Sequence, residues 1–426
     1  MDHLSGSAID FIKKKTELSN ILDRFNEHQK WWDKRYENGL DPYSKTIIGE
    51  IKPTCVTLDR KGKEYKGVNF ANQDYLSMAS NQKVKDAAKA AIDKYGVHSA
   101  GSPTLMGNTE PSRELEKELA SFLEMKDCTV FATGWSAGYG AVKALVGKGD
   151  HIILDKLCHA CLIEGALNSG AEVHIINHLC SEELEQKLSE IRLTNSKAGI
   201  LVVTESLFSM DSDVPDLKTF QELSHRYSAT LFVDMAHDLG CIAENGRGFL
   251  EKQKMVGKID IVMGSFSKTF ASNGGFVCSN NEALKTALRF SCGPHTFSNA
   301  ISPVQASIVR EVLKIIRSEE GKLLRKKMYD NASYLREKLS SLGGGLVGEP
   351  SAIIPLCIGE CGYSRRVVKA CAENGLILNL IEHPAVKKDS SRIRLQVMAE
   401  HTKEHLDFCA NTISKALEDC KEHSCA

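Results

Sequence analysis

Short apolar runs alternate with segments of helical period through the middle of the chain, and this alternation constrains the fold most strongly. The runs predicted as strands cover residues 128–132, 151–154, 173–176, 199–203, 230–233 and 259–263. The helices predicted between them include 134–145, 161–168 and 216–227. Such alternation indicates an α/β fold with a largely parallel sheet and helices on both faces. Ligands of such sheets bind beyond the carboxyl ends of the strands.

A lysine follows the last of these apolar runs, among hydroxyl residues and glycines. The stretch Gly264-Ser265-Phe266-Ser267-Lys268 is followed closely by Gly274-Gly275. A lysine in this setting is suited to form an imine with pyridoxal phosphate (PLP), and the serine hydroxyls are suited to face its phosphate. The glycines would allow close backbone approach. An ordinary solvated lysine is the alternative, since a motif of this length also occurs by chance.

Asp234 and His237 come directly after the strand predicted at 230–233, at the same edge of the sheet as Lys268. A buried aspartate is costly unless a cation pairs with it, and a protonated pyridine nitrogen would be such a cation. The turn at 133–138 opens a helix and would offer backbone N–H groups to a phosphate. Trp135, in this turn, is expected either near the cofactor or in the core.

The flanking segments predict a different organisation. An amphipathic helix is predicted at 8–37, a hairpin at 57–69 and a long polar loop at 96–109. Beyond residue 302, two long helices precede short strands at 353–358, 377–381 and 392–397 and a last helix, which indicates a smaller α+β domain. The expected division is an N-terminal arm and linker at 1–56, a large PLP-binding domain at 57–301 and a small domain at 302–426.

Composition argues against several classes of protein. The 426 residues carry a formal net charge of -1, which gives no reason to expect nucleic acid as a partner. No apolar run approaches the roughly 18 residues of a membrane span, and the first residues do not resemble a secretory signal. The 14 cysteines are dispersed, which favours free thiols and a cytoplasmic location. The Cys158–Cys161 pair lacks a second pair at zinc-binding spacing, so no metal is expected. Any membrane contact is expected to be peripheral.

Taken together, these motifs resemble the PLP-dependent α-oxoamine synthases, which have the aspartate-aminotransferase fold (type I). The resemblance covers the chain from about Asp41 to the last helix. Within the family, the similarity is greatest to soluble bacterial serine palmitoyltransferases. The stretches that carry this finer similarity are Asp41-Pro42-Tyr43, Thr296-Phe297-Ser298-Asn299, Leu378-Asn379-Leu380-Ile381 and Ala399-Glu400-His401-Thr402.

The resemblance implies a role for each candidate residue. Lys268 would hold PLP and move the Cα proton, Asp234 would bind the pyridine nitrogen, and His237 would contact the phenolic oxygen. His159 would stack on the ring, and Arg394 would bind the substrate carboxylate. The phosphate would be bound by Gly134, Trp135, Ser265 and Ser267, and by Ser298 and Asn299 of a neighbouring subunit, which implies a homodimer. Taken alone, His159 could instead be a helix cap and Arg394 half of a surface ion pair.

The implied reaction is a decarboxylating condensation of a small amino acid with an acyl-CoA thioester. It would release CoA and CO2 and give a 2-amino ketone, with serine favoured and a 3-ketosphinganine-type product, as in sphingolipid metabolism. The alternative is an 8-amino-7-oxononanoate synthase or a glycine C-acetyltransferase-like enzyme that uses alanine or glycine. Met235, Gln73 and Ser112 depart from the family pattern and leave the substrate pair open.

Two alternatives outside this activity are weaker. Ser265 and Lys268 also fit the S-x-x-K pattern of serine acyl-enzymes, but the S-D-N and K-T-G companions of that chemistry are missing. A non-catalytic subunit built on the same fold is the other alternative. The presence of Lys268, Asp234 and His237 together argues against it.

Overall fold

The computed structural model describes residues 6–12, 20–341 and 345–422. The chain divides into two compact units. Unit 1 comprises the described residues within 1–73, 210–212 and 327–426, and unit 2 comprises 74–209 and 213–326. The boundaries expected from the sequence, after residues 56 and 301, remain a prediction.

Unit 2 is built on a seven-stranded sheet with the order β4-β10-β9-β8-β7-β5-β6. Strands β9, β8, β7, β5 and β6 run parallel, and β10 lies antiparallel between β4 and β9. The strands are β4 (Asp127–Phe131), β5 (His151–Asp155), β6 (Glu172–Ile176), β7 (Ile200–Glu205), β8 (Thr230–Asp234), β9 (Ile261–Ser265) and β10 (Gly275–Ser279). The predicted largely parallel sheet is therefore confirmed, whereas β10 was not predicted.

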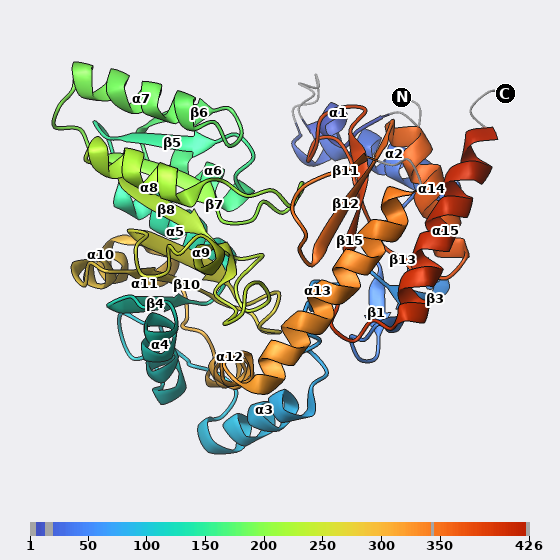
Figure 1. Ribbon diagram of the computed structural model, residues 1–426, viewed down its shortest axis with the longest axis horizontal. Helices are drawn as coiled ribbons and strands as arrows, with labels where there is room; N and C mark the ends of the chain where they lie inside the picture. Colours follow the sequence, from blue (N-terminus) through green and yellow to red (C-terminus); the bar gives the residue numbers. More distant parts are fainter. Residues whose placement is uncertain (1–5, 13–19, 342–344, 423–426) are drawn as a thin grey trace. The chain divides into compact units, whose positions relative to one another are not determined.

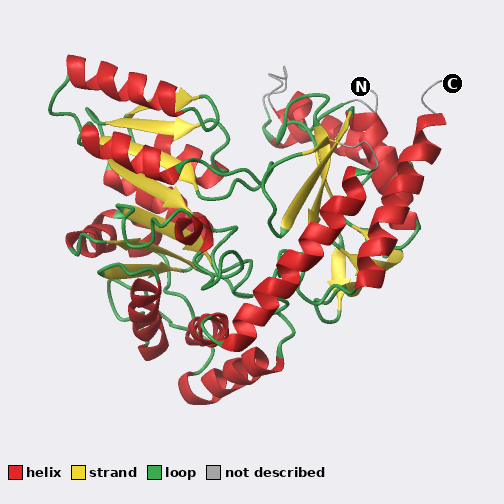
Figure 2. Cartoon of the chain, viewed as in Figure 1, coloured by secondary structure: helices red, strands yellow, loops and turns green. Residues whose placement is uncertain are grey.

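Helices cover both faces of this sheet (Figures 1 and 2). Helices α5 (Gly134–Leu145) and α6 (Ala160–Leu167) pack together, as do α7 (Ser181–Thr194) and α8 (Leu217–Arg226). Ile152 and Leu154 of β5 join the apolar core that includes Ala141 and Leu162 of α5 and α6. The remaining helices of unit 2 are α3 (Gln82–Tyr95), α4 (Glu110–Phe122), α9 (Gly248–Lys252), α10 (Ala283–Ser291), α11 (Gly293–Thr296) and α12 (Pro303–Ile316).

Unit 1 holds two four-stranded sheets, β1-β2-β3-β13 and β11-β12-β15-β14. Their strands are β1 (Thr46–Ile48), β2 (Thr54–Leu58), β3 (Glu64–Asn69), β11 (Gly345–Leu346), β12 (Ile353–Gly359), β13 (Leu376–Ile377), β14 (Asn379–Ile381) and β15 (Ser391–Gln396). The predicted hairpin at 57–69 is confirmed as β2 and β3. The single strand predicted at 377–381 is wrong, because β13 and β14 belong to different sheets. A period of two residues cannot show which neighbour a strand will pair with.

The helices of unit 1 include α14 (Cys361–Glu373) and α15 (Lys403–Glu422), and α13 (Glu319–Ser340) begins in unit 2 and continues into unit 1. The helix predicted at 8–37 is represented by α1 (Ile9–Ile12), the 3-10 turn η1 (Leu22–Phe25) and α2 (Asn26–Glu37), while 13–19 lie outside the described residues. Helix α2 packs on its own chain, since Trp31 is buried and Arg35 forms an ion pair with Glu382 at 3.1 Å. Throughout the described part of the chain, no helix combines the length and the apolar character needed to cross a bilayer.

Candidate active site

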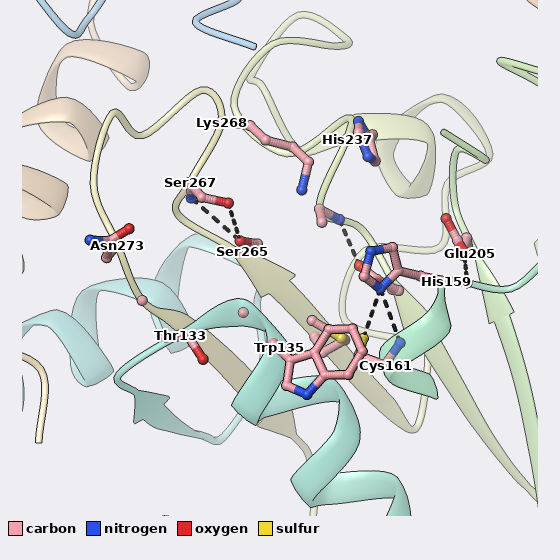
Figure 3. Close-up of a pocket in the computed structure, with 15 residues that line it drawn as sticks. Thr133, Trp135, His159, Cys161, Glu205, His237, Ser265, Ser267, Lys268 and Asn273 are labelled. Carbon is pink, nitrogen blue, oxygen red and sulfur yellow. Dashed lines mark hydrogen bonds between the residues drawn. The ribbon is translucent and has the colours of Figure 1, made fainter. Parts of the chain in front are cut away.

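Three parallel strands end at one pocket in unit 2. Glu205, Asp234 and Ser265 are the last residues of β7, β8 and β9, and the strand register places Glu205 beside Asp234. The pocket has a volume of about 280 Å³. It is lined by Thr133, Gly134, Trp135, His159, Cys161, Glu205, Asp234, Ala236, His237, Met263, Ser265, Ser267, Lys268, Asn273 and Gly274 (Figure 3). The structure thus brings eight of the eleven candidate residues together at the carboxyl ends of the strands, as expected for this sheet type.

Lys268 enters the pocket from the loop that follows β9, and its side chain extends into the open space (Figure 3). Just before it in the sequence, the hydroxyls of Ser265 and Ser267 lie 2.8 Å apart. The backbone N–H of Ser267 donates to the Ser265 Oγ at 3.4 Å. The end of β9 and the loop after it therefore present an amine and two hydroxyl groups to the same cavity.

Two buried carboxyl groups, those of Asp234 and Glu205, line the pocket. Asp234 accepts a hydrogen bond from the backbone N–H of Ala236 at 2.9 Å, and Glu205 accepts one from the backbone N–H of His159 at 2.5 Å. Burial raises the pKa of Asp234, whereas the positive charges of His159 and Lys268 lower it. Burial and the charge of Asp234 raise the pKa of Glu205 well above its usual range. These two carboxyl groups are suited to bind a cation, because a positive charge would offset the cost of burying the carboxylates.

His159 is the N-terminal cap of α6 and also lines the pocket. Its Nδ1 accepts from the backbone N–H of Cys161 at 3.3 Å and lies 3.0 Å from the Cys161 Sγ. Its ring meets Trp135 edge to face, with centroids 6.0 Å apart and an interplanar angle of 74°. The capping bond and the Trp135 contact fix the orientation of the imidazole. His159 can therefore cap α6 and line the pocket at the same time.

His237 is held by a tyrosine from a distant part of the sequence. Its Nδ1 lies 3.0 Å from the hydroxyl of Tyr75, and both side chains are buried. Tyr75 was not predicted as a site residue. The sequence gives no local signal for it, because the two residues are 162 positions apart.

The start of α5 approaches the end of β9 closely. A Cβ atom at Gly134 would collide with the Ser265 side chain, and one at Gly275 would lie 2.7 Å from the Gly134 Cα. Thr133 caps α5 by accepting a hydrogen bond from the Ser136 N–H at 3.0 Å. The first N–H groups of a helix and the positive end of its dipole favour an anion, and the Ser265 and Ser267 hydroxyls lie beside them. A phosphate group fits this corner of the pocket.

Glu205 is a further lining residue that was not predicted. A signal for it existed, since Glu205 ends a predicted strand in the same way as Asp234 does. The buried thiols of Cys158 and Cys161 show why their spacing alone was uninformative. The Cys158 Sγ donates to the Val203 carbonyl at 3.5 Å, whereas Cys161 faces the pocket. Burial raises the pKa of both thiols.

Three candidate residues do not line this pocket. Ser298 and Asn299 follow α11 in unit 2, outside the set of lining residues. Arg394 lies on β15 in unit 1, with its Nη1 3.7 Å from the Sδ of Met210. Ser112, one of the departures from the family pattern, is buried at the start of α4, where its Oγ accepts from the Thr109 N–H at 2.9 Å. The roles assigned to these residues remain predictions.

Comparison with known proteins gives a consistent set of relatives. Residues 65–413 match the family described as aminotransferase class I and II. The chain is 35% identical over 354 residues to the 8-amino-7-oxononanoate synthase of Thermoanaerobacter pseudethanolicus, which covers 83% of this chain and 88% of that protein. The 8-amino-7-oxononanoate synthase of Treponema denticola is 33% identical over 398 residues, with 93% and 98% covered.

Solved structures give a complementary likeness. Serine palmitoyltransferase from S. paucimobilis, solved with a bound PLP–myriocin aldimine, has a TM-score of 0.88 and 27% identity, and the match covers 94% of this chain and 99% of that one. The serine palmitoyltransferase of Sphingomonas wittichii has a TM-score of 0.88 and 27% identity, with 95% and 99% covered.

Proposed function

Because this chain belongs to the class I and II aminotransferase family, as a PLP-dependent α-oxoamine synthase of fold type I, we propose that it condenses alanine with an acyl-CoA thioester. The coarser activity, condensation of an amino acid with an acyl-CoA, is that of the family, and PLP is its cofactor. The observation that supports alanine is the 35% identity to 8-amino-7-oxononanoate synthase. A product of that type carries an amino group beside a ketone and ends in a carboxylate.

The lining residues fit PLP. Lys268 would hold it through its amine, and Gly134, Ser265 and Ser267 would bind its phosphate at the α5 start. Asp234 would bind the protonated ring nitrogen, which supplies the positive charge that this buried carboxylate needs. When bound, PLP supplies an electron-accepting ring for the negative charge that develops at the amino-acid Cα. His159, held by its hydrogen bond with the Cys161 N–H and by its contact with Trp135, would lie against one face of that ring.

The chain's own groups would then handle the proton and orient the amino acid. The Lys268 Nζ would take the Cα proton and return it after CO2 has left, as a general base and acid. The Tyr75 hydroxyl holds the His237 imidazole at 3.0 Å, so His237 would keep one orientation toward the cofactor. Arg394 would bind the substrate carboxylate through its guanidinium. The roles of Lys268 and His237 are supported by their positions in the pocket and by their match to the family motifs, whereas that of Arg394 is supported by the motif match alone.

A homodimer is part of this proposal. Ser298 and Asn299 would reach the phosphate of the partner subunit. Around them, the large apolar side chains of Phe297, Met106 and Leu105 are 88%, 90% and 78% exposed. The loop at 96–109 is tied to the same region, since the Ala300 N–H donates to the Gly101 carbonyl at 2.9 Å. An exposed apolar surface of this kind is typical of a protein–protein interface.

Serine is the second candidate substrate. It is favoured by the TM-score of 0.88 and the 94% coverage in the comparison with serine palmitoyltransferase. It is also the reading that the sequence motifs favoured. The sequence identity of 27% in that comparison is lower than the 35% shared with 8-amino-7-oxononanoate synthase, so we place alanine first.

The deciding experiment is a matrix of substrates. The purified holoenzyme is incubated with alanine, serine or glycine and with either a long-chain acyl-CoA or a medium-chain acyl-CoA that ends in a carboxylate. Products are identified by mass, and Lys268→Ala serves as the inactive control. We expect an alanine-derived amino ketone. A serine-derived ketone as the main product would replace alanine by serine, and no ketone from any pair would overturn the proposal.

A further inference from the structure

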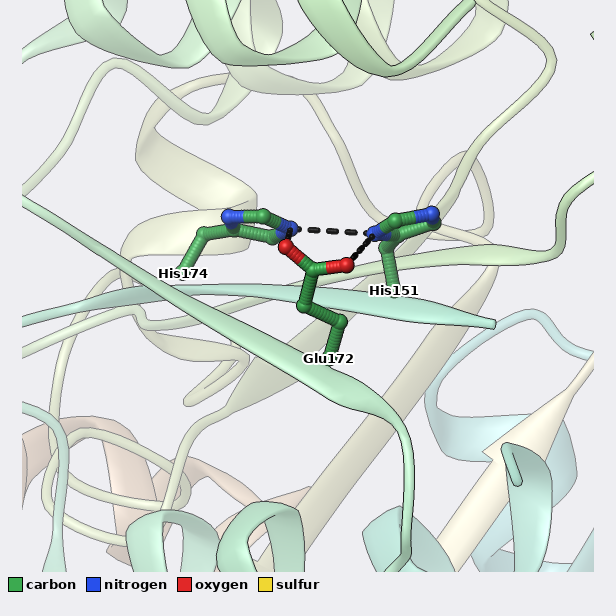
Figure 4. A group of neighbouring side chains, drawn as sticks. All are labelled: His151, Glu172 and His174. Atoms are coloured by element: carbon green, nitrogen blue, oxygen red, sulfur yellow. Dashed lines mark hydrogen bonds and ion pairs between the residues drawn. The ribbon is translucent and has the colours of Figure 1, made fainter. Parts of the chain in front are cut away.

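Two histidines and a glutamate meet at the opposite end of the sheet from the pocket. His151 is the first residue of β5, and Glu172 and His174 lie near the start of β6. The parallel register pairs His151 with Glu172 and Ile153 with His174. Residues two apart in a strand share a face, so all three side chains stand on one face of the sheet (Figure 4). Ile152, next to His151 in β5, packs against α5 and α6 on one face of the sheet. The His151 side chain therefore points to the opposite face, which α7 covers.

The three potential ligand atoms have the spacing of a metal coordination shell. The His151 Nδ1 and the His174 Nε2 lie 3.0 Å apart. One oxygen of Glu172, Oε2, lies 3.6 Å from the His151 Nδ1, and the other, Oε1, lies 3.7 Å from the His174 Nε2. Ligands bound tetrahedrally to zinc at about 2.0–2.1 Å are separated by about 3.3 Å. The observed separations bracket that value, so small side-chain adjustments would place all three atoms on one ion.

The cluster is shielded from solvent at its histidines and open to solvent at its glutamate. The histidine side chains are only 13% and 15% exposed, while that of Glu172 is 67% exposed and leaves the site reachable from solvent.

We infer that His151, His174 and Glu172 bind one divalent transition-metal ion, with Zn²⁺ as the expected occupant. Two imidazoles and one carboxylate suit zinc, and water would complete the tetrahedron. The ion would join the start of β5 to that of β6, the edge strand of the sheet. It would therefore stabilise this edge, and it would be independent of PLP, whose proposed site lies at the opposite end of the same sheet.

The first test measures binding directly. The PLP-loaded full-length protein is treated with a chelator, dialysed and titrated with Zn²⁺ by calorimetry, and Co²⁺ is used as a spectroscopic probe. We expect one equivalent of Zn²⁺ per chain, and a Co²⁺ spectrum with tetrahedral bands and no thiolate charge-transfer band. The absence of saturable binding would overturn the inference and leave a hydrogen-bonded histidine pair. A thiolate band would also overturn it, because the ion would then lie on cysteines.

The second test assigns the ligands. His151→Gln, His174→Gln and the more conservative Glu172→Gln are compared with His225→Gln, which changes a histidine that pairs with Asp260 outside the cluster. We expect each cluster variant to lower Zn²⁺ affinity roughly tenfold or more and the control to leave it unchanged. Zn²⁺ should raise the unfolding temperature of the wild type but not that of the cluster variants, while PLP content stays constant. Unchanged affinity in both histidine variants would refute the assignment. If the histidine variants do not fold, Glu172→Gln and the Co²⁺ spectrum of the wild type still decide.

Discussion

At the scale of single residues, Asp238 is a buried carboxyl group that the proposed mechanism does not use. Its oxygens accept from the Ser206 hydroxyl at 2.7 Å and from the Phe249 N–H at 2.6 Å. Burial raises its pKa to about 7, although these two hydrogen bonds act in the opposite direction. The carboxyl group is therefore more easily ionised in the unfolded chain than in the folded one.

This difference predicts a pH-dependent stability. A carboxyl group with a raised folded-state pKa favours the folded protein below its unfolded pKa of about 4 and loses that contribution as the pH rises toward 7. We expect the stability of Asp238→Asn relative to the wild type to rise by about 2.5 kcal/mol when the pH is raised from 5 to 8. Thermal unfolding of both proteins at the two pH values, with excess PLP, measures this. A stability difference that does not change with pH would contradict the prediction.

At the scale of elements, the contact between the start of α5 and the end of β9 shapes the part of the pocket that a phosphate group fits. Gly134 allows this approach because the space of its missing Cβ is filled by Ser265. The start of α5, its cap Thr133 and the hydroxyls of Ser265 and Ser267 line the same part of the pocket. They can do so only if α5 and β9 stay this close. Gly147, in contrast, has nothing within 4 Å of where a Cβ would lie.

We therefore expect Gly134→Ala to cost about 1–3 kcal/mol by overpacking and to weaken PLP binding, since the helix start must move away. Gly147→Ala is the matched control and should leave both properties nearly unchanged. Chemical denaturation and titration with PLP, followed by its visible absorption, give the two quantities. Wild-type PLP affinity in Gly134→Ala would show that this contact does not position the phosphate.

A second connection between elements depends on the charge of His178, which follows β6. Its Nδ1 lies 2.8 Å from Asp155 at the end of β5, and its Nε2 lies 2.8 Å from Asp213, beyond β7. Burial opposes protonation, but the hydrogen bonds and charges of the two aspartates outweigh it and raise the pKa of His178 to about 9. A protonated His178 thus links the ends of three neighbouring strands.

The stabilisation from His178 should be complete below the ordinary histidine pKa of about 6.5 and should fall as the pH rises through 9. The pKa difference corresponds to about 3 kcal/mol. We expect the stability gap between the wild type and His178→Asn to be largest at pH 6 and to shrink by about this amount at pH 10. Asp213→Asn, which removes one partner, should shift the loss of stability to lower pH. Equal gaps at pH 6 and pH 10 would mean that His178 is neutral in the folded protein.

At the scale of the whole molecule, the proposed homodimer connects assembly with cofactor binding. We expect Phe297→Asp to favour the monomer, because it places a charge in an apolar interface, and to weaken PLP binding through the loss of the partner's phosphate contacts. Sedimentation and PLP titration measure the two effects. Leu193→Asp, at a side chain that is 84% exposed on α7, is the control and should remain dimeric. A wild-type protein that sediments as a monomer with full PLP affinity would refute the shared site.

The sequence by itself determined the class of fold and the reactive residues at the strand ends. Apolar period and strand–helix order are local properties, so the sheet and the placement of Asp234 at the end of β8 and of Lys268 beyond β9 followed from them. Only the tertiary structure decided the insertion of β10, the partner of His237 and the convergence of His151 with His174. These depend on which strands pair and which distant side chains meet. Such contacts leave no periodic pattern in the sequence, because they form between segments that are distant in the chain and depend on how those segments pack together.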